Sequence, residues 1–350
     1  MTVGLIADPG LATKIAEALA DELPAEFART ISDQIVWKFE VCSRALPLDE
    51  DGNIEVWKRS SEVKHDQQWD LLICLTELTR RLGTRLFVSD TSISHGAALI
   101  SLPALGPVRL RHRVREAIVY VVRAMVADQD TGERRMPFSL ADPTRLELTS
   151  DDEGTSSVVK LRPLRGRLRL LLGMVRVNRP WRLIPSLSST FAAAVATAAF
   201  GVFYYSIWNM ADAMSAVRLA TVSVIAISAL VLWLILYNGL WARPQNLDDR
   251  KNAALYNSAT VLTLVVGVSI MYVLLFCAVL LGALVVIPWE YLESRLGHPA
   301  TWLDYVELAL LASALGTFAG ALGSSFESDY AVRNATFAKR EQERHARTQT

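Results

Sequence analysis

One segment gathers residue types that could carry out catalysis. Residues 89–96 read Ser-Asp-Thr-Ser-Ile-Ser-His-Gly, and they follow a predicted strand. A loop with hydroxyls, a carboxylate and an imidazole can hold a catalytic site, so Asp90 and His95 are the candidate catalytic residues. Serine, aspartate and glycine are also ordinary loop residues, and the chain has no G-x-S-x-G nucleophile elbow. The sequence leaves both interpretations of this loop open.

A second candidate site lies where the first predicted strand meets the first predicted helix. Ligands of open α/β sheets bind at the carboxyl ends of strands, and a helix N-terminus accepts an anion. Asp8 and Gly10 are therefore the candidate cofactor-binding residues. A turn with a helix cap is the alternative, since the chain has neither G-x-G-x-x-G nor G-x-x-x-x-G-K-[ST]. No cofactor is predicted.

No metal site is predicted either. The histidines do not pair at i, i+3 or i, i+4, and H-E-x-x-H is absent. The cysteine spacing fits no zinc site or disulfide framework. Cys42 and Cys74 lie in apolar runs and are expected to be buried free thiols. The five histidines are His65, His95, His112, His298 and His345.

The elements that must position these residues alternate between strand and helix over residues 1–130. This alternation predicts a three-layer α/β domain with a mostly parallel sheet. Residues 131–160 are polar and turn-rich, which predicts a linker or a hairpin. The predicted strands are 3–7, 34–41, 70–76, 85–90 and 96–105, and the predicted helices are 11–23, 54–68 and 109–127.

The second half of the chain has the composition of a membrane domain. The 350 residues are 51% hydrophobic, and the apolar residues are concentrated between 183 and 323. A bilayer core needs about 20 apolar residues per helix. The four segments that meet this length are about 184–207, 217–238, 260–287 and 303–323.

Basic residues flank these segments unevenly and predict their orientation. Arginines and lysines cluster at 161–182, at 243–251 and in the tail 324–350, whereas the other two loops contain few. The positive-inside rule then places both termini in the cytoplasm and makes the chain a multi-pass protein of the cell membrane. The N-terminus does not resemble a signal peptide, which agrees with a cytosolic α/β domain. The formal net charge is zero, so no nucleic-acid partner is predicted.

The basic juxtamembrane segment 161–182 mixes arginine with leucine, valine, methionine and tryptophan. Such a segment can lie flat on an anionic leaflet, and an ordinary positive flank is the alternative. The arginines expected to meet anionic lipid are Arg162, Arg165, Arg167, Arg169, Arg176, Arg179 and Arg182.

Gly316 and Gly320 in the fourth predicted span allow close helix approach, either inside the chain or in a homo-oligomer.

Ionisable residues within a span would be the sign of a transporter. Asp304 and Glu307 lie one turn apart at the outer end of the fourth predicted span. Solvation, or a partner such as Arg218, explains them at that depth. A small transporter is therefore an alternative function.

The whole chain resembles a group of bacterial four-span membrane proteins of unestablished function. The similarity lies in MTVGLIADPGL at the start, LPLDEDG at 46–52, LISLPALG at 99–106 and the four spans. Some members carry the label 5,10-methylene-tetrahydrofolate dehydrogenase. The Y-x-x-x-K motif and the glycine-rich loop of that enzyme family are absent here, so the resemblance does not imply that activity.

The order DLLICLTEL, RLFVSD, GAALISLPAL and VREAIVYVVRAM is also similar to archaemetzincin-type zinc proteases. The zinc helix of that family maps onto residues 116–123. Val119 and Tyr120 occupy the places of its first histidine and glutamate, and Arg123 occupies that of its second histidine. This resemblance implies a protease scaffold without its zinc ligands and base.

Together these features favour a non-enzymatic membrane protein with a cytosolic sensing or interaction domain on a four-helix anchor. A membrane-bound enzyme that uses residues 89–96 is the first alternative, and a small transporter is the second.

Overall fold

The computed structural model describes residues 1–46, 56–82, 85–126, 146–150, 156–161, 163–182, 187–242 and 249–323. The chain separates into two compact units. The first, Met1–Val177, is called the α/β unit, and the second, Asn178–Arg340, is called the helical unit. The predicted tail 324–350 and residues 131–145 lie outside the described residues.

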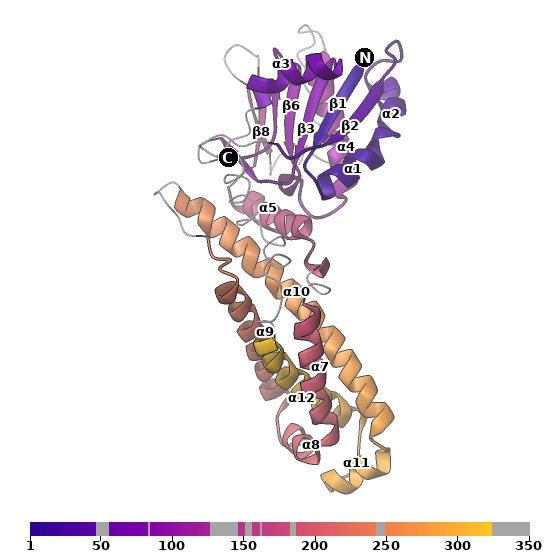
Figure 1. The fold of residues 1–350 in the computed structure, drawn as a ribbon, viewed down its shortest axis with the longest axis vertical. Coiled ribbons are helices and arrows are strands. Elements are labelled where there is room, and N and C mark those ends of the chain that lie inside the picture. Colours follow the sequence, from indigo (N-terminus) through magenta and orange to yellow (C-terminus); the bar gives the residue numbers. More distant parts are fainter. Residues whose placement is uncertain are drawn as a thin grey trace. The chain divides into compact units, whose positions relative to one another are not determined.

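The α/β unit contains one mixed sheet with the strand order β2-β1-β3-β6-β5-β8-β7, and β4 pairs with β5 (Figure 1). The first four strands in this order are parallel. The pairs from β6 to β7, and the pair β4–β5, are antiparallel. The bounds are β1 Thr2–Ala7, β2 Lys38–Ser43, β3 Leu71–Thr76, β4 Arg80–Leu82, β5 Arg85–Ser92, β6 Ala97–Ser101, β7 Leu146–Ser150 and β8 Ser156–Leu161.

The mostly parallel sheet predicted from the sequence is corrected to a mixed one. Only residues 93–96 join β5 to β6, and so short a connection can make a hairpin but not a parallel crossover. Strand β5 also continues to Ser92 and pairs with β6 and β8. Residues 89–92 are therefore strand, and the predicted 89–96 loop is wrong over its first half.

The helices of this unit are α1 Leu11–Ala20, α2 Leu23–Thr30, α3 Val56–Gln67 and α4 Leu110–Val126, with a 3₁₀ turn η1 at Pro103–Leu105. The predicted helix 11–23 ends early, and α2 begins with Pro24 in its first turn, where proline is tolerated. The apolar run 96–105, predicted as a strand throughout, leaves the sheet after Ser101. Helix α4 faces the core with Val114, Ile118 and Val121, which are fully buried.

The segment before the helical unit belongs to the α/β unit. Residues 146–150 and 156–161 form the hairpin β7–β8, and β8 extends the sheet through its pairing with β5. Helix α5, Pro163–Asn178, follows this hairpin, and the 3₁₀ turn η2, Pro180–Arg182, follows α5. The hairpin alternative predicted for 131–160 is thus the one found in its described part.

The helical unit contains α7 Ser188–Phe203, α8 Tyr205–Asp212, α9 Ala216–Tyr237, α10 Asp249–Val286, α11 Trp289–Leu296 and α12 Trp302–Gly323. Three of these helices, α9, α10 and α12, are long and apolar enough to cross a membrane. The second and fourth predicted spans match α9 and α12 closely. Helix α10 begins before the third predicted span, and its 38 residues extend over about 57 Å, which is longer than a bilayer core is thick.

The first predicted span, 184–207, is not one straight helix. Helix α7 ends at Phe203, Tyr204 is extended, and α8 leaves at 84° to α7. The break removes the Tyr205 amide from the Gly201 carbonyl, its partner in a continuous helix. The Trp208 indole N–H donates to that carbonyl instead, at 3.0 Å. Trp208 is buried, with 4% of its surface exposed.

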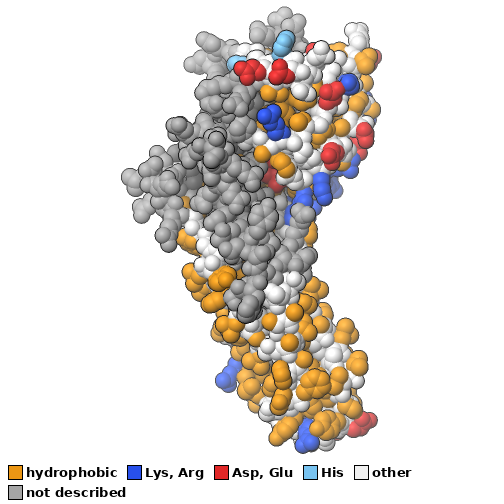
Figure 2. All heavy atoms as spheres, viewed as in Figure 1, with side chains coloured by type: hydrophobic (Ala, Val, Ile, Leu, Met, Phe, Trp, Pro, Cys, Tyr) orange, Lys and Arg blue, Asp and Glu red, His pale blue; other side chains and the backbone are white. Residues whose placement is uncertain are grey.

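Apolar side chains dominate the visible surface of the helical unit (Figure 2). Leu236 on α9, Val285 on α10 and Leu322 on α12 are 69%, 84% and 68% exposed. Water disfavours this much exposed apolar area, whereas lipid tails accept it.

Helices α7 and α12 pack with little space between them. A Cβ atom at Gly316 would lie 2.4 Å from the carbonyl oxygen of Ala194, and one at Gly320 would lie 3.0 Å from that of Thr190. Contacts this short require glycine on the α12 side. Gly316 and Gly320 thus allow close packing inside the chain, which is one of the two roles predicted for them.

Replacing Gly316 by leucine should separate α7 from α12 and destabilise the helical unit by about 2 kcal/mol or more, the typical effect of overpacking. Gly282→Leu is the matched control, because a Cβ at Gly282 meets nothing within 4 Å. Thermal unfolding of the full chain in detergent measures both variants. Equal loss of stability in the two variants would contradict the close α7–α12 contact.

Candidate functional site

The first candidate site, at Asp8 and Gly10, is occupied by side chains of the chain itself. Asp8 is fully buried at the end of β1. One of its carboxylate oxygens accepts hydrogen bonds from the Thr76 hydroxyl and the Glu77 amide, at 2.8 and 2.9 Å, and the other accepts from the Leu46 amide at 3.3 Å. Asp8 therefore ties the ends of β1 and β3 to the segment after β2.

Glu77 occupies the N-terminus of α1. Its Oε1 atom accepts hydrogen bonds from the amides of Leu11 and Ala12, which satisfies two of the unpaired donors that begin a helix. Gly10 has a φ of 135°, and a Cβ there would lie 2.6 Å from the same oxygen. Glycine is required at this position both by the backbone conformation and by the close approach of the carboxylate.

The carboxyl-end crevice between β1 and β3 thus holds two buried carboxylates, Asp8 and Glu77, which are 0% and 4% exposed. The anion that α1 accepts in this structure is Glu77. A phosphate at the same place would meet both negative charges. Cofactor binding at Asp8 and Gly10 stays a prediction, and the geometry is that of an internal helix cap.

Asp90 and His95 lie on a strand and in a turn. Asp90 is half-buried in β5, between Leu99 of β6 and Val158 of β8. His95 is exposed in the β5–β6 turn. The hydroxyls of Ser92 and Ser94 lie 2.9 and 3.1 Å from its Nδ1.

These contacts, with the bond from the Lys64 ammonium to the His95 carbonyl at 2.7 Å, shape the turn. A catalytic role for Asp90 and His95 stays a prediction.

The arginines expected at an anionic leaflet divide into different environments. Arg169 is buried, and its Nε and Nη2 both donate to the Leu105 carbonyl, at 3.2 and 2.9 Å. Arg113 donates to the same oxygen at 2.6 Å. Arg169 therefore holds α5 against the rest of the α/β unit. Arg176 on the same helix is exposed. Arg162 lies outside the described residues.

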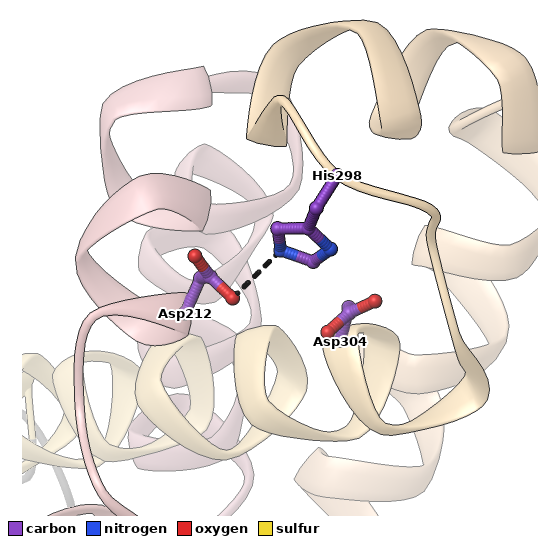
Figure 3. Close-up of side chains that lie close together, drawn as sticks. All are labelled: Asp212, His298 and Asp304. Carbon is purple, nitrogen blue, oxygen red and sulfur yellow. Dashed lines mark hydrogen bonds and ion pairs between the residues drawn. The ribbon is translucent and has the colours of Figure 1, made fainter.

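A polar cluster not predicted from the sequence lies in the helical unit. Asp212 at the end of α8, His298 in the α11–α12 connection and Asp304 in the first turn of α12 meet in one place (Figure 3). One donor atom from each residue lies within 4.8 Å of the other two. This spacing suits a divalent cation or a proton shared with an imidazole.

The hydrogen bonds of His298 favour a proton over a metal ion at this cluster. Its Nδ1 lies 3.0 Å from the Pro299 carbonyl, and its Nε2 lies 3.1 Å from the Asp212 carboxylate. Both partners are acceptors, so the doubly protonated imidazole is the form that satisfies both contacts. The pKa of His298 is accordingly raised, first by the Pro299 carbonyl and then by the bond to Asp212. A metal ion would have to displace the Nε2 proton.

Asp304 has a separate structural role. Its Oδ2 accepts from the backbone amide and the hydroxyl of Thr301, at 2.5 and 3.1 Å, and this caps the start of α12. The capping bonds explain an acidic residue at the end of an apolar helix.

The sequence contained one signal for this cluster. Asp212 and His298 are 86 residues apart, so no spacing motif joins them. Both, however, fall in the two loops that the positive-inside rule places on the same side. Histidine pairs at i, i+3 or i, i+4 are local in sequence, whereas the contact between Asp212 and His298 is made by tertiary packing.

No protein-family model, no curated protein and no solved structure matches this chain. The resemblances drawn from sequence patterns therefore stay predictions.

Glu77→Ala should weaken α1, because two amides at its start lose their acceptor. We expect a loss of about 1–3 kcal/mol in the local opening free energy, measured as faster amide hydrogen exchange over residues 11–20 in the full chain. Glu17→Ala, on the exposed face of the same helix, is the control. Equal exchange in both variants would show that Glu77 is not the cap.

His298→Gln should have a pH-dependent effect. The folded pKa of His298 is raised above its ordinary 6.5, so its stabilising effect is present below that pH and is lost as the pH rises through the folded value. The difference in Tm between the parent and the variant in detergent should be larger at about pH 5.5 than at about pH 8.5. The control His65→Gln, on exposed α3, should show no such trend. A pH-independent difference for His298→Gln would contradict the charged imidazole.

Proposed function

We propose that this chain is a membrane protein with four crossings, and that its α/β unit is a cytosolic sensing or interaction domain. The observation that carries the proposal is the exposed apolar surface of α9, α10 and α12. No soluble domain gains by exposing helices of this length and composition. Their place in a bilayer explains the surface directly.

The remaining crossing, which is the first in chain order, is assigned to α7. Its 16 residues extend over only about 24 Å, which is short of a bilayer core. It packs along α12, however, through contacts that run from Thr190 and Gly320 to Gly201 and Ala312. A helix in such contact with a span shares its depth. In this arrangement α8 and α11, which contact each other at one end of the unit (Figure 1), lie at the membrane surface.

Four crossings put both termini on one side, and the arginine distribution puts that side in the cytosol. The aromatic residues of α8 and α11 agree with an interfacial position. Of the exposed ones, Tyr291 packs edge to face on the buried Trp208 at 5.8 Å, and the Arg295 guanidinium lies 5.4 and 5.1 Å from the rings of Tyr205 and Tyr291.

One feature favours sensing or interaction over catalysis in the α/β unit. The carboxyl ends of β1 and β3 carry Asp8 and Glu77, whose carboxylates accept hydrogen bonds from the chain itself. The three-layer arrangement is also part of the proposal. Helix α4 contacts α1 and α2, whereas α3 contacts β3 and β6, and right-handed crossovers on either side of β1 would place α3 on the opposite face from α1.

Partners follow from the same arrangement. Anionic lipid remains the proposed partner of the exposed Arg176 and of the other juxtamembrane arginines, with the exception of the buried Arg169. A homo-oligomer through Gly316 and Gly320 also stays a prediction. It would require a second chain to displace α7 from those glycines.

The topology can be tested with single cysteines in a chain whose Cys42, Cys74 and Cys277 are replaced by alanine. Ser294→Cys on α11 should react with a membrane-impermeant maleimide in intact cells, because that end is placed outside. Asp33→Cys, on the exposed surface of the α/β unit, should react only after lysis.

A cysteine added after Thr350 decides the number of crossings. With four crossings it reacts only after lysis, as Asp33→Cys does. Reaction of the added cysteine in intact cells, while Asp33→Cys stays protected, would mean an odd number of crossings and would remove α7 from the spans.

A further inference from the structure

We propose that the α/β unit binds a phosphate group attached to a partly apolar molecule, in a pocket between α1, α4 and α5. The inference rests on the proposed function, since it names the ligand class that the sensing domain would recognise. It uses the face of α1 formed by Leu11, Ile15 and Leu19 and not the carboxylates of Asp8 and Glu77.

The pocket has a volume of about 550 Å³, within the range of small-molecule sites. Its floor is apolar and is formed by Ile15 and Leu19 of α1 and Leu110 of α4, which are at most 7% exposed. A ligand that fits this floor has an apolar part of moderate size.

The rim of the pocket is cationic. Four arginines line it, together with a single carboxylate, that of Glu22. An imbalance of this kind raises the local concentration of anions. The arginines are Arg109, Arg111, Arg115 and Arg176.

Part of this rim is already held in place. One Arg111 nitrogen donates to the Ala18 carbonyl at 2.7 Å and to Glu22 at 2.6 Å, which joins α4 to α1 across the pocket. Arg115 donates to Nδ1 of His112 at 2.9 Å. A fixed guanidinium loses less conformational freedom when it binds an anion.

Arg109 has a conformation that needs an explanation. It precedes α4 with a φ of 51°, in the left-handed region that residues other than glycine rarely adopt. Its carbonyl accepts from the Arg113 amide at 3.0 Å, so the residue begins the helix. Backbone strain of this kind gathers at binding sites, and here it belongs to an exposed arginine on the pocket rim.

The α5 side of the pocket is also fixed. Arg169 holds α5 through the Leu105 carbonyl, and a Cβ at Gly173 would lie 2.0 Å from the Pro103 carbonyl oxygen. The backbone of α5 therefore lies directly on the η1 turn. Arg176, two turns after Arg169, is brought to the pocket by this docking.

Several guanidinium groups around one small volume favour phosphate over carboxylate. A phosphate monoester carries up to two charges and three acceptor oxygens, and arginine binds it through paired N–H donors. Two sources share this chemistry: a soluble phosphorylated metabolite and the headgroup of an anionic phospholipid.

The test uses the full chain in detergent and measures binding by isothermal titration calorimetry. Inorganic pyrophosphate is the soluble probe. Short-chain phosphatidic acid, below its micellar concentration, is the lipid probe, and phosphatidylcholine of equal chain length is its neutral control. We expect saturable binding of at least one anionic probe and none of phosphatidylcholine.

The variant Arg109→Gln/Arg115→Gln should weaken that binding at least tenfold. Arg111 is left in place because it bridges two helices. Arg123→Gln is the matched control, since it removes an exposed arginine from α4 outside the pocket, and its affinity should stay within twofold of the parent. Unchanged Tm in both variants shows that folding is intact.

Binding of pyrophosphate alone assigns the site to a soluble ligand, and binding of phosphatidic acid alone assigns it to a lipid headgroup. The inference is overturned if neither anion binds, or if Arg123→Gln weakens binding as much as the double variant. Such a failure leaves the membrane topology untouched, because cysteine labelling tests that separately.

Discussion

Two buried carboxylates determine how the α/β unit is assembled. Asp8 joins the ends of β1 and β3 to the segment after β2, and Glu77 then begins α1. Burial of two carboxylates is costly unless each is fully hydrogen-bonded. Here backbone amides and one hydroxyl supply the donors. The consequence is functional as well as structural, because the place where open α/β sheets usually bind ligands is filled.

The helical unit follows a different constraint, since its surroundings supply few hydrogen-bond donors. The bend at Tyr204 frees the Gly201 carbonyl, and the Trp208 indole replaces the lost amide. Tyr272 likewise donates to Ser223 at 2.8 Å within the buried interior. Polar groups in an apolar medium need such internal partners. The bend turns α8 toward α11, and the Asp212–His298–Asp304 cluster results from that change of direction.

The sequence predicted the features that depend on local periodicity. Strands β1 and β3, helix α4, and the long helices α9 and α12 appear within a few residues of their predicted bounds. It did not predict the features that depend on distant contacts. The pairing of β5 with β8, which lies more than 60 residues beyond it, extends the antiparallel half of the sheet that the β5–β6 hairpin begins. The bend after Phe203 is accompanied by the hydrogen bond from Trp208 to the Gly201 carbonyl, a contact that hydropathy does not reveal.

The candidate sites show the same division. Asp8 and Gly10 could be located from a strand–turn–helix pattern, but their partner Glu77 is 69 residues from Asp8. Only that contact distinguishes an internal cap from an anion site. The arginine pocket was equally hidden, because Arg109, Arg111 and Arg115 lie at the start of α4 and Arg176 lies on α5, so only tertiary packing brings them together. The buried Arg169 and the exposed Arg176 lie two turns apart on the same side of α5, so helical periodicity alone does not distinguish their environments.

In the phosphate site proposed above, helix α5 is the element that its docking contacts hold in place. It is docked by Arg169 on the Leu105 carbonyl, it supplies Arg176 to the pocket, and it continues within ten residues into α7. A ligand that contacts both α4 and α5 binds only when α5 is docked, so it stabilises the docked state by its differential affinity. By the same linkage, any change that loosens α5 must lower the affinity for the ligand. The docked position of α5 is therefore the state that the proposed ligand would stabilise in the α/β unit.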